Sequence, residues 1–133
     1  MSFELAVQSA IYTRLNSQLG YNVYDSVPQQ VDSSQGFPFV TIGEDTLNEW
    51  DTDEQNGADV TITIHTWSRY YGRKETKEMQ GAIYTALHRQ QTNLSYSGYL
   101  FVDCFFLSSE SFLDTDGQTR HGVQTFRVII REL

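Results

Sequence analysis

The stretch at residues 57–89 constrains the fold most, because its hydrophobic period changes partway along. Between residues 59 and 67, β-branched apolar residues alternate with threonine, histidine and tryptophan. That period of two predicts a strand with one buried face. From about residue 73 the apolar residues recur at helical spacing, with the charged residues mostly off the stripe. A strand that leads into an amphipathic helix predicts a layer of helix packed on sheet.

The rest of the chain adds one more helix and further strands. Residues 2–19 form an amphipathic pattern that begins at a capping Ser2 and stops at Gly20. Strands are predicted at residues 37–49, 99–107 and 118–131, and a short edge strand near Val23. The fold class is therefore α+β: a two-layer sandwich of a mainly antiparallel, four- to five-stranded sheet and two amphipathic helices. The expected core contains Val60, Ile62, Ile64, Met79, Ile83, Leu87, Phe126, Val128 and Ile130.

We expect a single domain over residues 1–133, since the chain has 133 residues. Within it, residues 45–57 are expected to be an acidic mobile loop, and residues 108–133 a C-terminal hairpin that follows the strand at 99–107. Both faces of that strand are apolar. It is expected to be a central strand or to pack one face on a partner. Cys104 alternates with its core residues and is interpreted as a buried small hydrophobe.

The charge is unevenly distributed. The formal net charge is −8, which disfavours nucleic acid and anionic membrane as direct partners. No Lys or Arg occurs between Arg14 and Arg69, an interval rich in Asp and Glu, and a basic cluster follows at residues 69–77. These runs are either an ordinary solvated loop and helix start, or two complementary patches on different sides of the domain.

The sequence contains no recognisable catalytic constellation, and we predict neither an enzyme nor a bound cofactor or metal. His65, His88 and His121 are far apart without metal-ligand spacing, and are expected to be separate histidines. The Asp114–Gly117 segment has the wrong spacing for an EF-hand loop, so it is interpreted as a hairpin turn. The apolar runs are too short to cross a membrane, and polar residues interrupt the first nineteen, which are not expected to be a signal peptide.

Three segments carry a family resemblance: FPFVTIGEDTLNEWDT at residues 37–52, VTITIHTWSRYYGRKETKEMQGAIYTAL at 60–87 and SFLDTDGQTRHGVQTFRVIIREL at 111–133. These segments resemble the tail-completion family of long-tailed bacteriophages, also described as tail-terminator or tail-to-head joining proteins. The shared features are a strand entry at P-F-V-x-I-G, a strand followed by a helix, and a D-x-D-G hairpin. Together they span about half of the chain, and the order of elements covers nearly all of it. These motifs are structural, so they indicate a family rather than a mechanism.

The resemblance implies a structural virion protein that acts by binding. It implies a homo-oligomeric ring, commonly a hexamer, that caps the tail tube and joins it to the head or neck. The implied partners are the tail tube protein and a head-side connector, with no sequence-specific nucleic acid. The implied location is the host cytoplasm before assembly and the virion tail or neck afterwards. Whether the free subunit is a monomer stays open.

A ring needs one patch that meets a different patch on the neighbouring subunit. The candidate interface residues are Glu49, Trp50, Asp51, Asp53, Glu54, Trp67, Arg69, Tyr70, Arg73, Lys74 and Lys77. Two alternatives remain: a neck or head-closure protein of the same phage, and a stand-alone small-molecule or peptide binding module that uses an aromatic cluster of Trp67, Tyr70 and Tyr71. A hydrolase of unrecognised type is a more distant third.

Overall fold

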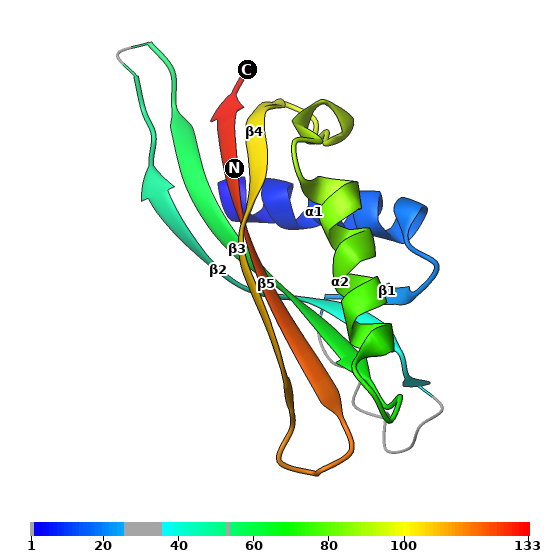
Figure 1. The fold of residues 1–133 in the computed structure, drawn as a ribbon. Helices are drawn as coiled ribbons and strands as arrows, with labels where there is room; N and C mark the ends of the chain where they lie inside the picture. The colour runs from blue at the N-terminus through cyan, green and yellow to red at the C-terminus, as the bar shows by residue number, and fades with distance from the viewer. Residues whose placement is uncertain (1, 26–35, 53) are drawn as a thin grey trace.

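The computed structural model describes residues 2–25, 36–52 and 54–133, which form one five-stranded sheet with two helices on one of its faces (Figure 1). The expected α+β sandwich is confirmed. The elements in chain order are α1 (Phe3–Gln18), β1 (Asn22–Tyr24), β2 (Phe39–Glu49), β3 (Gly57–Ser68), α2 (Lys74–Leu87), the 3-10 helix η2 (Gln91–Asn93), β4 (Tyr99–Leu113) and β5 (Arg120–Glu132).

The strand order in the sheet is β1-β2-β3-β5-β4. β1 pairs with β2 in parallel, and every other pairing is antiparallel. The β2–β3 and β4–β5 hairpins therefore turn at opposite ends of the sheet, which Figure 1 shows at its top and bottom. This arrangement gives the molecule two distant ends made from different residues.

Both helices cover the face of the sheet that carries its aliphatic residues. In α1 the Ser2 hydroxyl accepts a hydrogen bond from the Leu5 backbone N–H at 3.1 Å, the predicted N-cap. Val7 and Ile11 of α1 are fully buried against the same cluster as Met79 of α2. All nine residues expected in the core are 0 % exposed. Burying each such side chain stabilises the fold by about 1.5–3 kcal/mol.

β4 differs from the prediction in length and position. It continues to Leu113 and lies at the edge of the sheet, so the expectation of a central strand is wrong. Register shifts between Phe101 and Asp103, and again between Phe106 and Ser108, interrupt its alternation. Each shift changes which residues face the core. Leu100 and Val102 are consequently 40 % and 38 % exposed, which leaves open the expectation that one face of this strand packs on a partner.

The acidic segment is also shorter than expected. Residues 45–49 belong to β2 and pair with residues 58–62 of β3, after a register shift that follows Ile42. The Trp50 N–H donates to the Gly57 carbonyl at 3.1 Å and continues the ladder by one step. The loop therefore comprises residues 50–56 rather than 45–57. Alternation could not reveal this boundary, because the end of β2 is exposed and carries polar residues.

The turn between β4 and β5 is organised by Asp116. Its carboxylate accepts hydrogen bonds from the backbone N–H groups of Gln118 and Thr119 and from the Thr119 hydroxyl. Gly117 follows with φ of +73°, a conformation that glycine adopts without strain. Arg69, at the end of β3, donates to the Thr119 hydroxyl and lies 3.5 Å from the Asp116 carboxylate. The predicted hairpin turn is thus present and tied to the neighbouring strand.

Two glycines provide a matched test of this packing. A Cβ added to Gly81 of α2 meets nothing within 4 Å, whereas a Cβ added to Gly122 of β5 would lie 2.2 Å from the Thr66 hydroxyl oxygen. We expect Gly81→Ala to raise the free energy of unfolding by about 1 kcal/mol, since alanine favours helix. Gly122→Ala should lower it by about 1–3 kcal/mol through overpacking. Urea unfolding measures both, and equal effects of the two substitutions would contradict the described packing.

A second prediction concerns the stability of the β4–β5 turn. The hydrogen bond from the Thr119 hydroxyl, followed by the two backbone N–H groups, lowers the pKa of the Asp116 carboxyl from 3.8 to about 2. A carboxyl with a lowered folded-state pKa stabilises the protein above its unfolded pKa, and loses that effect as the pH falls through the folded value. Asp116→Ala should lower the Tm at neutral pH, and its difference from wild type should shrink between pH 4 and pH 2. Glu110→Ala, an exposed carboxylate on the same hairpin, is the control and should show no such pattern.

Candidate subunit interface

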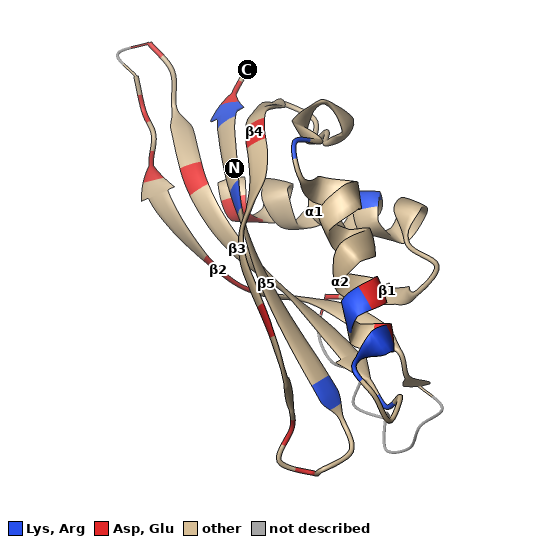
Figure 2. Ribbon diagram, in the orientation of Figure 1, with Lys and Arg blue, Asp and Glu red and all other residues tan. Residues whose placement is uncertain are grey.

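The charged residues predicted at an interface lie in two groups, one at each end of the sheet (Figure 2). Glu49, Trp50, Asp51 and Glu54 lie at the β2–β3 turn, and we call them the acidic tip. Asp53 lies outside the described residues. Arg69, Tyr70, Arg73, Lys74 and Lys77 lie at the other end, between the end of β3 and the first turn of α2. The structure therefore brings each sequence cluster together and keeps the two clusters apart.

The acidic tip is a closed turn. The Asp51 carboxylate accepts the Gly57 N–H at 2.8 Å, and the Thr52 N–H donates to the Gln55 carbonyl at 2.9 Å. Gln55 also bonds through its side chain to Arg131 of β5. The Trp50 ring lies over Gly57, where an added Cβ would be 2.9 Å from its Cε3 atom. Trp50 nevertheless remains 40 % exposed, so it packs on its own hairpin and still presents an apolar surface.

A mainly apolar cavity of about 400 Å³ opens beside the acidic tip. Trp50 and Gly57 line it on the hairpin, Leu100 and Val102 line it on β4, and Arg131 contributes a cation. Its walls come from both outer parts of the sheet. Sequence reasoning did not identify this cavity, because β4 joins it only through its position at the sheet edge.

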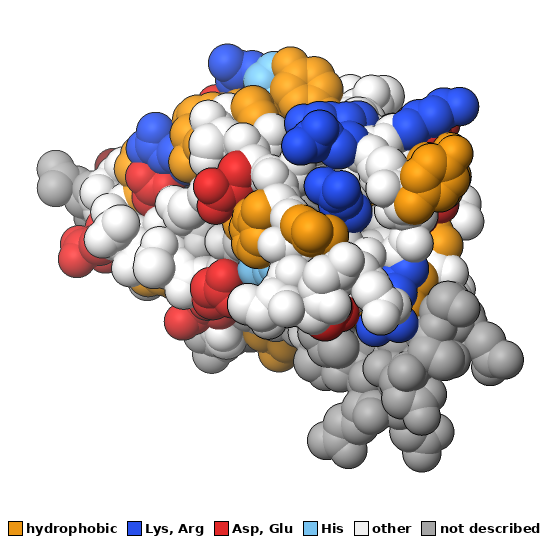
Figure 3. Space-filling view, turned by 60° about the horizontal axis from the view of Figure 1, so that its bottom comes forward, with side chains coloured by type: hydrophobic (Ala, Val, Ile, Leu, Met, Phe, Trp, Pro, Cys, Tyr) orange, Lys and Arg blue, Asp and Glu red, His pale blue; other side chains and the backbone are white. Residues whose placement is uncertain are grey.

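The opposite end of the sheet is basic. Arg73, Lys74 and Lys77 are exposed, and Arg120 joins them from the first residue of β5. We call these four residues the basic end. Figure 3 shows Lys and Arg side chains gathered beside hydrophobic ones on this face. Sequence reasoning missed Arg120, which is distant in the chain and reaches this end only through the β3–β5 register.

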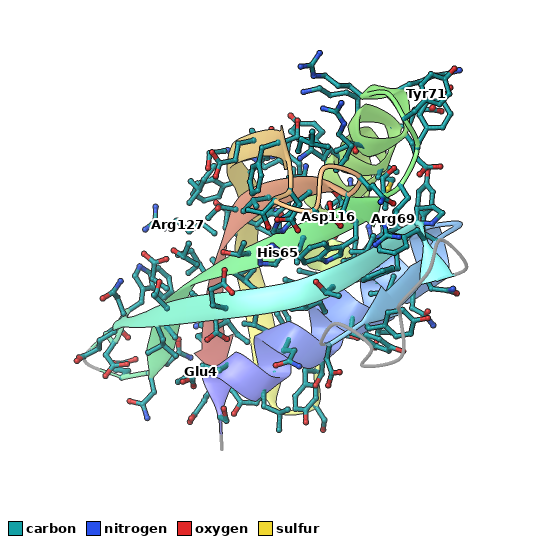
Figure 4. All side chains as sticks on the ribbon, turned by 90° about the horizontal axis from the view of Figure 1, so that it is seen from below. Glu4, His65, Arg69, Tyr71, Asp116 and Arg127 are labelled. Carbon is teal, nitrogen blue, oxygen red and sulfur yellow. The ribbon has the colours of Figure 1, made fainter. Side chains whose placement is uncertain are left out.

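Arg69 is not a free member of this basic group. Its guanidinium lies 4.7 Å from the centre of the Phe37 ring, in addition to its contacts with Thr119 and Asp116 (Figure 4). These contacts connect the entry of β2, the end of β3 and the β4–β5 turn. The role that the described geometry supports for Arg69 is structural.

The aromatic cluster proposed for a binding module does not form one pocket. Trp67 stacks on His121 with ring centres 3.9 Å apart and donates its ring N–H to Thr41, on the sheet face away from the helices. Tyr70 and Tyr71 stack on each other at 4.7 Å, and Tyr71 is 87 % exposed. The cavity that Tyr70 lines includes neither Trp67 nor Tyr71 among the described residues.

The expectation of separate histidines is wrong for one pair. His65 Nδ1 and His121 Nε2 lie 2.7 Å apart, and His65 Nε2 is 3.3 Å from a Glu44 carboxylate oxygen. β3 and β5 are neighbours, and their register pairs Trp67 with His121, so His65 lies on the adjacent diagonal. Burial, and then the nearby His65, lower the pKa of His121. His88 is separate and accepts the Phe106 N–H through Nδ1.

Chemistry at single residues is limited. Cys104 is 0 % exposed as predicted, and burial raises the pKa of its thiol to about 12, which suppresses the reactive thiolate. Among the residues that the structure describes, no group of three or more His, Cys, Asp or Glu is placed to hold a metal ion. No helix within those residues is long and apolar enough to span a membrane.

Comparison with known proteins supports the family resemblance. Residues 5–131 match the family described as tail completion protein gp17. The tail completion protein gp17 of Bacillus phage SPP1 is 25 % identical over 134 residues, with 98 % of each chain covered. A chain from the virion of a native gene transfer agent particle has a similar fold, with a TM-score of 0.83 and 22 % identity over 98 % of this chain and 99 % of that one.

The family match spans nearly the whole chain, and the curated relative has the same extent. The fold is shared with a chain of a virion particle. A structural protein of this kind acts by binding rather than by turnover, so it is not an enzyme. The chain belongs to the tail completion protein gp17 family, and is a structural protein of a bacteriophage tail.

Proposed function

We propose that the protein forms a homo-oligomeric ring, a hexamer, which closes the phage tail tube and joins it to the head-side neck. One observation carries the proposal: a single subunit presents an acidic tip and a basic end on opposite ends of its sheet. A heterologous interface, in which one patch meets a different patch on the neighbour, closes into a ring when its rotation allows. Membership of the tail completion family supports this role.

The two ends act between subunits rather than within one. β3 has twelve residues and runs between them, so they lie roughly 35–40 Å apart on one chain. The Debye length at physiological salt is about 8 Å, so the two ends hardly influence each other inside a subunit. Between exposed charges each ion pair contributes about 0–1 kcal/mol. Charge therefore selects the partner and the register, while apolar burial supplies most of the affinity.

Exposed apolar residues are available for that burial. Trp50 belongs to the acidic tip, and Leu100 and Val102 line the cavity beside it on the edge strand β4. Leu107 and Leu113, further along β4, are 46 % and 47 % exposed. Exposed apolar groups that gather along a sheet edge mark protein contacts. In the assembled virion we assign them to the neighbouring subunit, the tail tube protein and the head-side connector.

The acidity of the chain agrees with a position around a DNA passage. A strongly basic pore would bind phosphate and hinder the movement of DNA, whereas this chain has a net charge of −8. The subunit would be made in the host cytoplasm and then enter the virion. A neck or head-closure protein of the same phage has similar requirements, and its binding partner distinguishes it.

The second candidate function is a small-molecule or peptide binding module. The cavity of about 400 Å³ beside Trp50 favours it, since ligand sites are concave and mainly apolar. A monomer that binds a ligand in this cavity, and ignores phage tails, would favour the module over the tail protein.

The decisive experiment is reconstitution of tails that lack this protein. We expect phage deleted for the gene to yield separate filled heads and tails, and the added purified chain to bind the tails and restore joining. Pull-downs with tail tube and connector proteins identify the partner. Retention of the connector alone would favour the neck protein, while binding to neither would contradict both phage roles.

We also expect the described loop residues, 50–52 and 54–56, to be mobile in the free subunit despite the hydrogen bonds that close the turn, and ordered after assembly. The loop is highly charged, and Trp50 is its one large apolar residue. Amide hydrogen exchange at the N–H groups of Glu54 and Asn56 should be fast in the free chain and at least tenfold slower in reconstituted tails, which corresponds to about 1.4 kcal/mol of added protection. Exchange in the middle of β3 is the internal control. Equal rates at the loop in both states would contradict its ordering.

A further inference from the structure

A second cavity lies within the basic end, between the first turn of α2 and the β4–β5 hairpin. It has a volume of about 430 Å³. Arg73 and Arg120 line it, and Leu113, which pairs with Arg120, provides an exposed apolar surface. Phe112 also borders the cavity, but its ring packs on His121, on the other face of the hairpin. Neither arginine side chain forms a hydrogen bond or ion pair with another residue in the described part of the chain. The cavity therefore combines two unneutralised cations with an exposed apolar surface.

One side chain that lines this cavity lacks a hydrogen-bond partner within the described residue ranges. Thr76 lines it and is 1 % exposed, and its hydroxyl oxygen has no hydrogen-bond partner among the described residues. A buried hydroxyl without a partner is costly. Thr76 belongs to the first turn of α2, whose capping residue Arg73 makes no side-chain cap hydrogen bond. The N–H groups of an uncapped first turn, and the helix dipole, favour an anion there.

We propose that this cavity, here called the arginine pocket, binds the acidic tip of a second copy of the chain. The inference rests on the proposed ring and deepens it, because it replaces a general attraction of charges by a defined site. A carboxylate of Glu49 or Glu54 pairs with Arg73 and Arg120. It also accepts hydrogen bonds from the Thr76 hydroxyl and the first-turn N–H groups of α2. Trp50 packs on Leu113.

The chemistry of the tip matches that of the pocket. Trp50 is an exposed aromatic residue between acids, and Leu113 is an exposed apolar residue beside the two arginines of the pocket. Glu49 and Glu54 have exposed carboxylates without an ion-pair partner in the described ranges. Asp51 instead holds the turn through Gly57, so it keeps the tip in shape rather than reaching out. Arginine and carboxylate form strong, directional pairs.

An acidic tip that occupies the pocket belongs to another copy, because a subunit cannot reach its own pocket. The β2–β3 turn, which carries the tip, and the β4–β5 turn, beside the pocket, lie at opposite ends of the same sheet (Figures 1 and 2). Each copy would therefore give its tip to one neighbour and receive a tip from the other. The net charge of −8 makes a nucleic-acid phosphate the weaker alternative.

Cysteine crosslinking tests the contact directly. A chain with Ser111→Cys in the pocket and Asn56→Cys beside the tip keeps Glu49 and Glu54. The native Cys104 is buried and its thiol has a raised pKa, so it stays unreactive. The matched control combines Ser111→Cys with Thr13→Cys, an exposed position on α1. Both chains are oxidised free in solution and on tails that lack the protein.

We expect the Ser111→Cys, Asn56→Cys chain to form a ladder of disulfide-linked oligomers, and the control to form none. Equal ladders from both chains would overturn the proposal. The absence of a ladder, while wild-type chain still oligomerises or binds tails, would reject the arginine pocket and leave the proposed function standing. A ladder without binding to tails would support the pocket and contradict the tail role. The absence of both the ladder and tail binding would reject the pocket and the tail role together.

Charge exchange provides a second measurement. Arg120→Glu lies outside the core, and should weaken self-association by about tenfold, as loss of a central arginine contact does. Adding Glu54→Arg to the same chain should restore much of it. Lys77→Glu is the control, since Lys77 is exposed on α2 and does not line the pocket. Glu49→Arg is tested in the same way. An equal loss with Lys77→Glu, no recovery with either Glu54→Arg or Glu49→Arg, or Arg120-dependent binding of a short DNA duplex without a ladder would each overturn the proposal.

Discussion

The ladder between β3 and β5 is the interaction on which the rest of the structure depends. All twelve residues of β3 pair with β5 in continuous register, from Gly57 opposite Arg131 to Ser68 opposite Arg120. The pairings of β2 with β3 and of β4 with β5 both contain register shifts, so the irregularity is confined to the outer pairings. The central pair thereby keeps one continuous, mainly apolar buried face, on which both helices dock.

The same ladder decides what the molecule presents at its ends. Because β3 and β5 are antiparallel and nearly equal in length, each end of the pair collects the start of one strand and the end of the other. Arg120 reaches α2 in this way, and Arg131 reaches the acidic tip. A subunit with unlike ends can pair them head to tail with its neighbours, as a heterologous interface requires.

The central features of the fold could be predicted from the sequence, because period and burial are local properties. The alternation in β3 and the stripe in α2 identified a core that the structure confirms. The bulges in β4 could not be predicted, since an inserted residue changes the facing of its neighbours without any change in composition. The pairing of His65 with His121, and the addition of Arg120 to the basic end, depend on strand order and register. Those arise from contacts between segments distant in the chain, which no local pattern encodes.

The distribution of burial separates folding from assembly. The core consists of one cluster shared by both helices and the covered face of the sheet, and it is complete within one subunit. The acidic tip and the arginines of the basic end lie outside that cluster. Substitutions at Glu54 or Arg120 therefore leave the aliphatic contacts intact, and a change in assembly there reports on the contact between subunits. Trp50 is the exception, because it also covers Gly57 of its own hairpin. The charged residues are thus the cleaner probes of the interface, even though apolar burial provides most of its affinity.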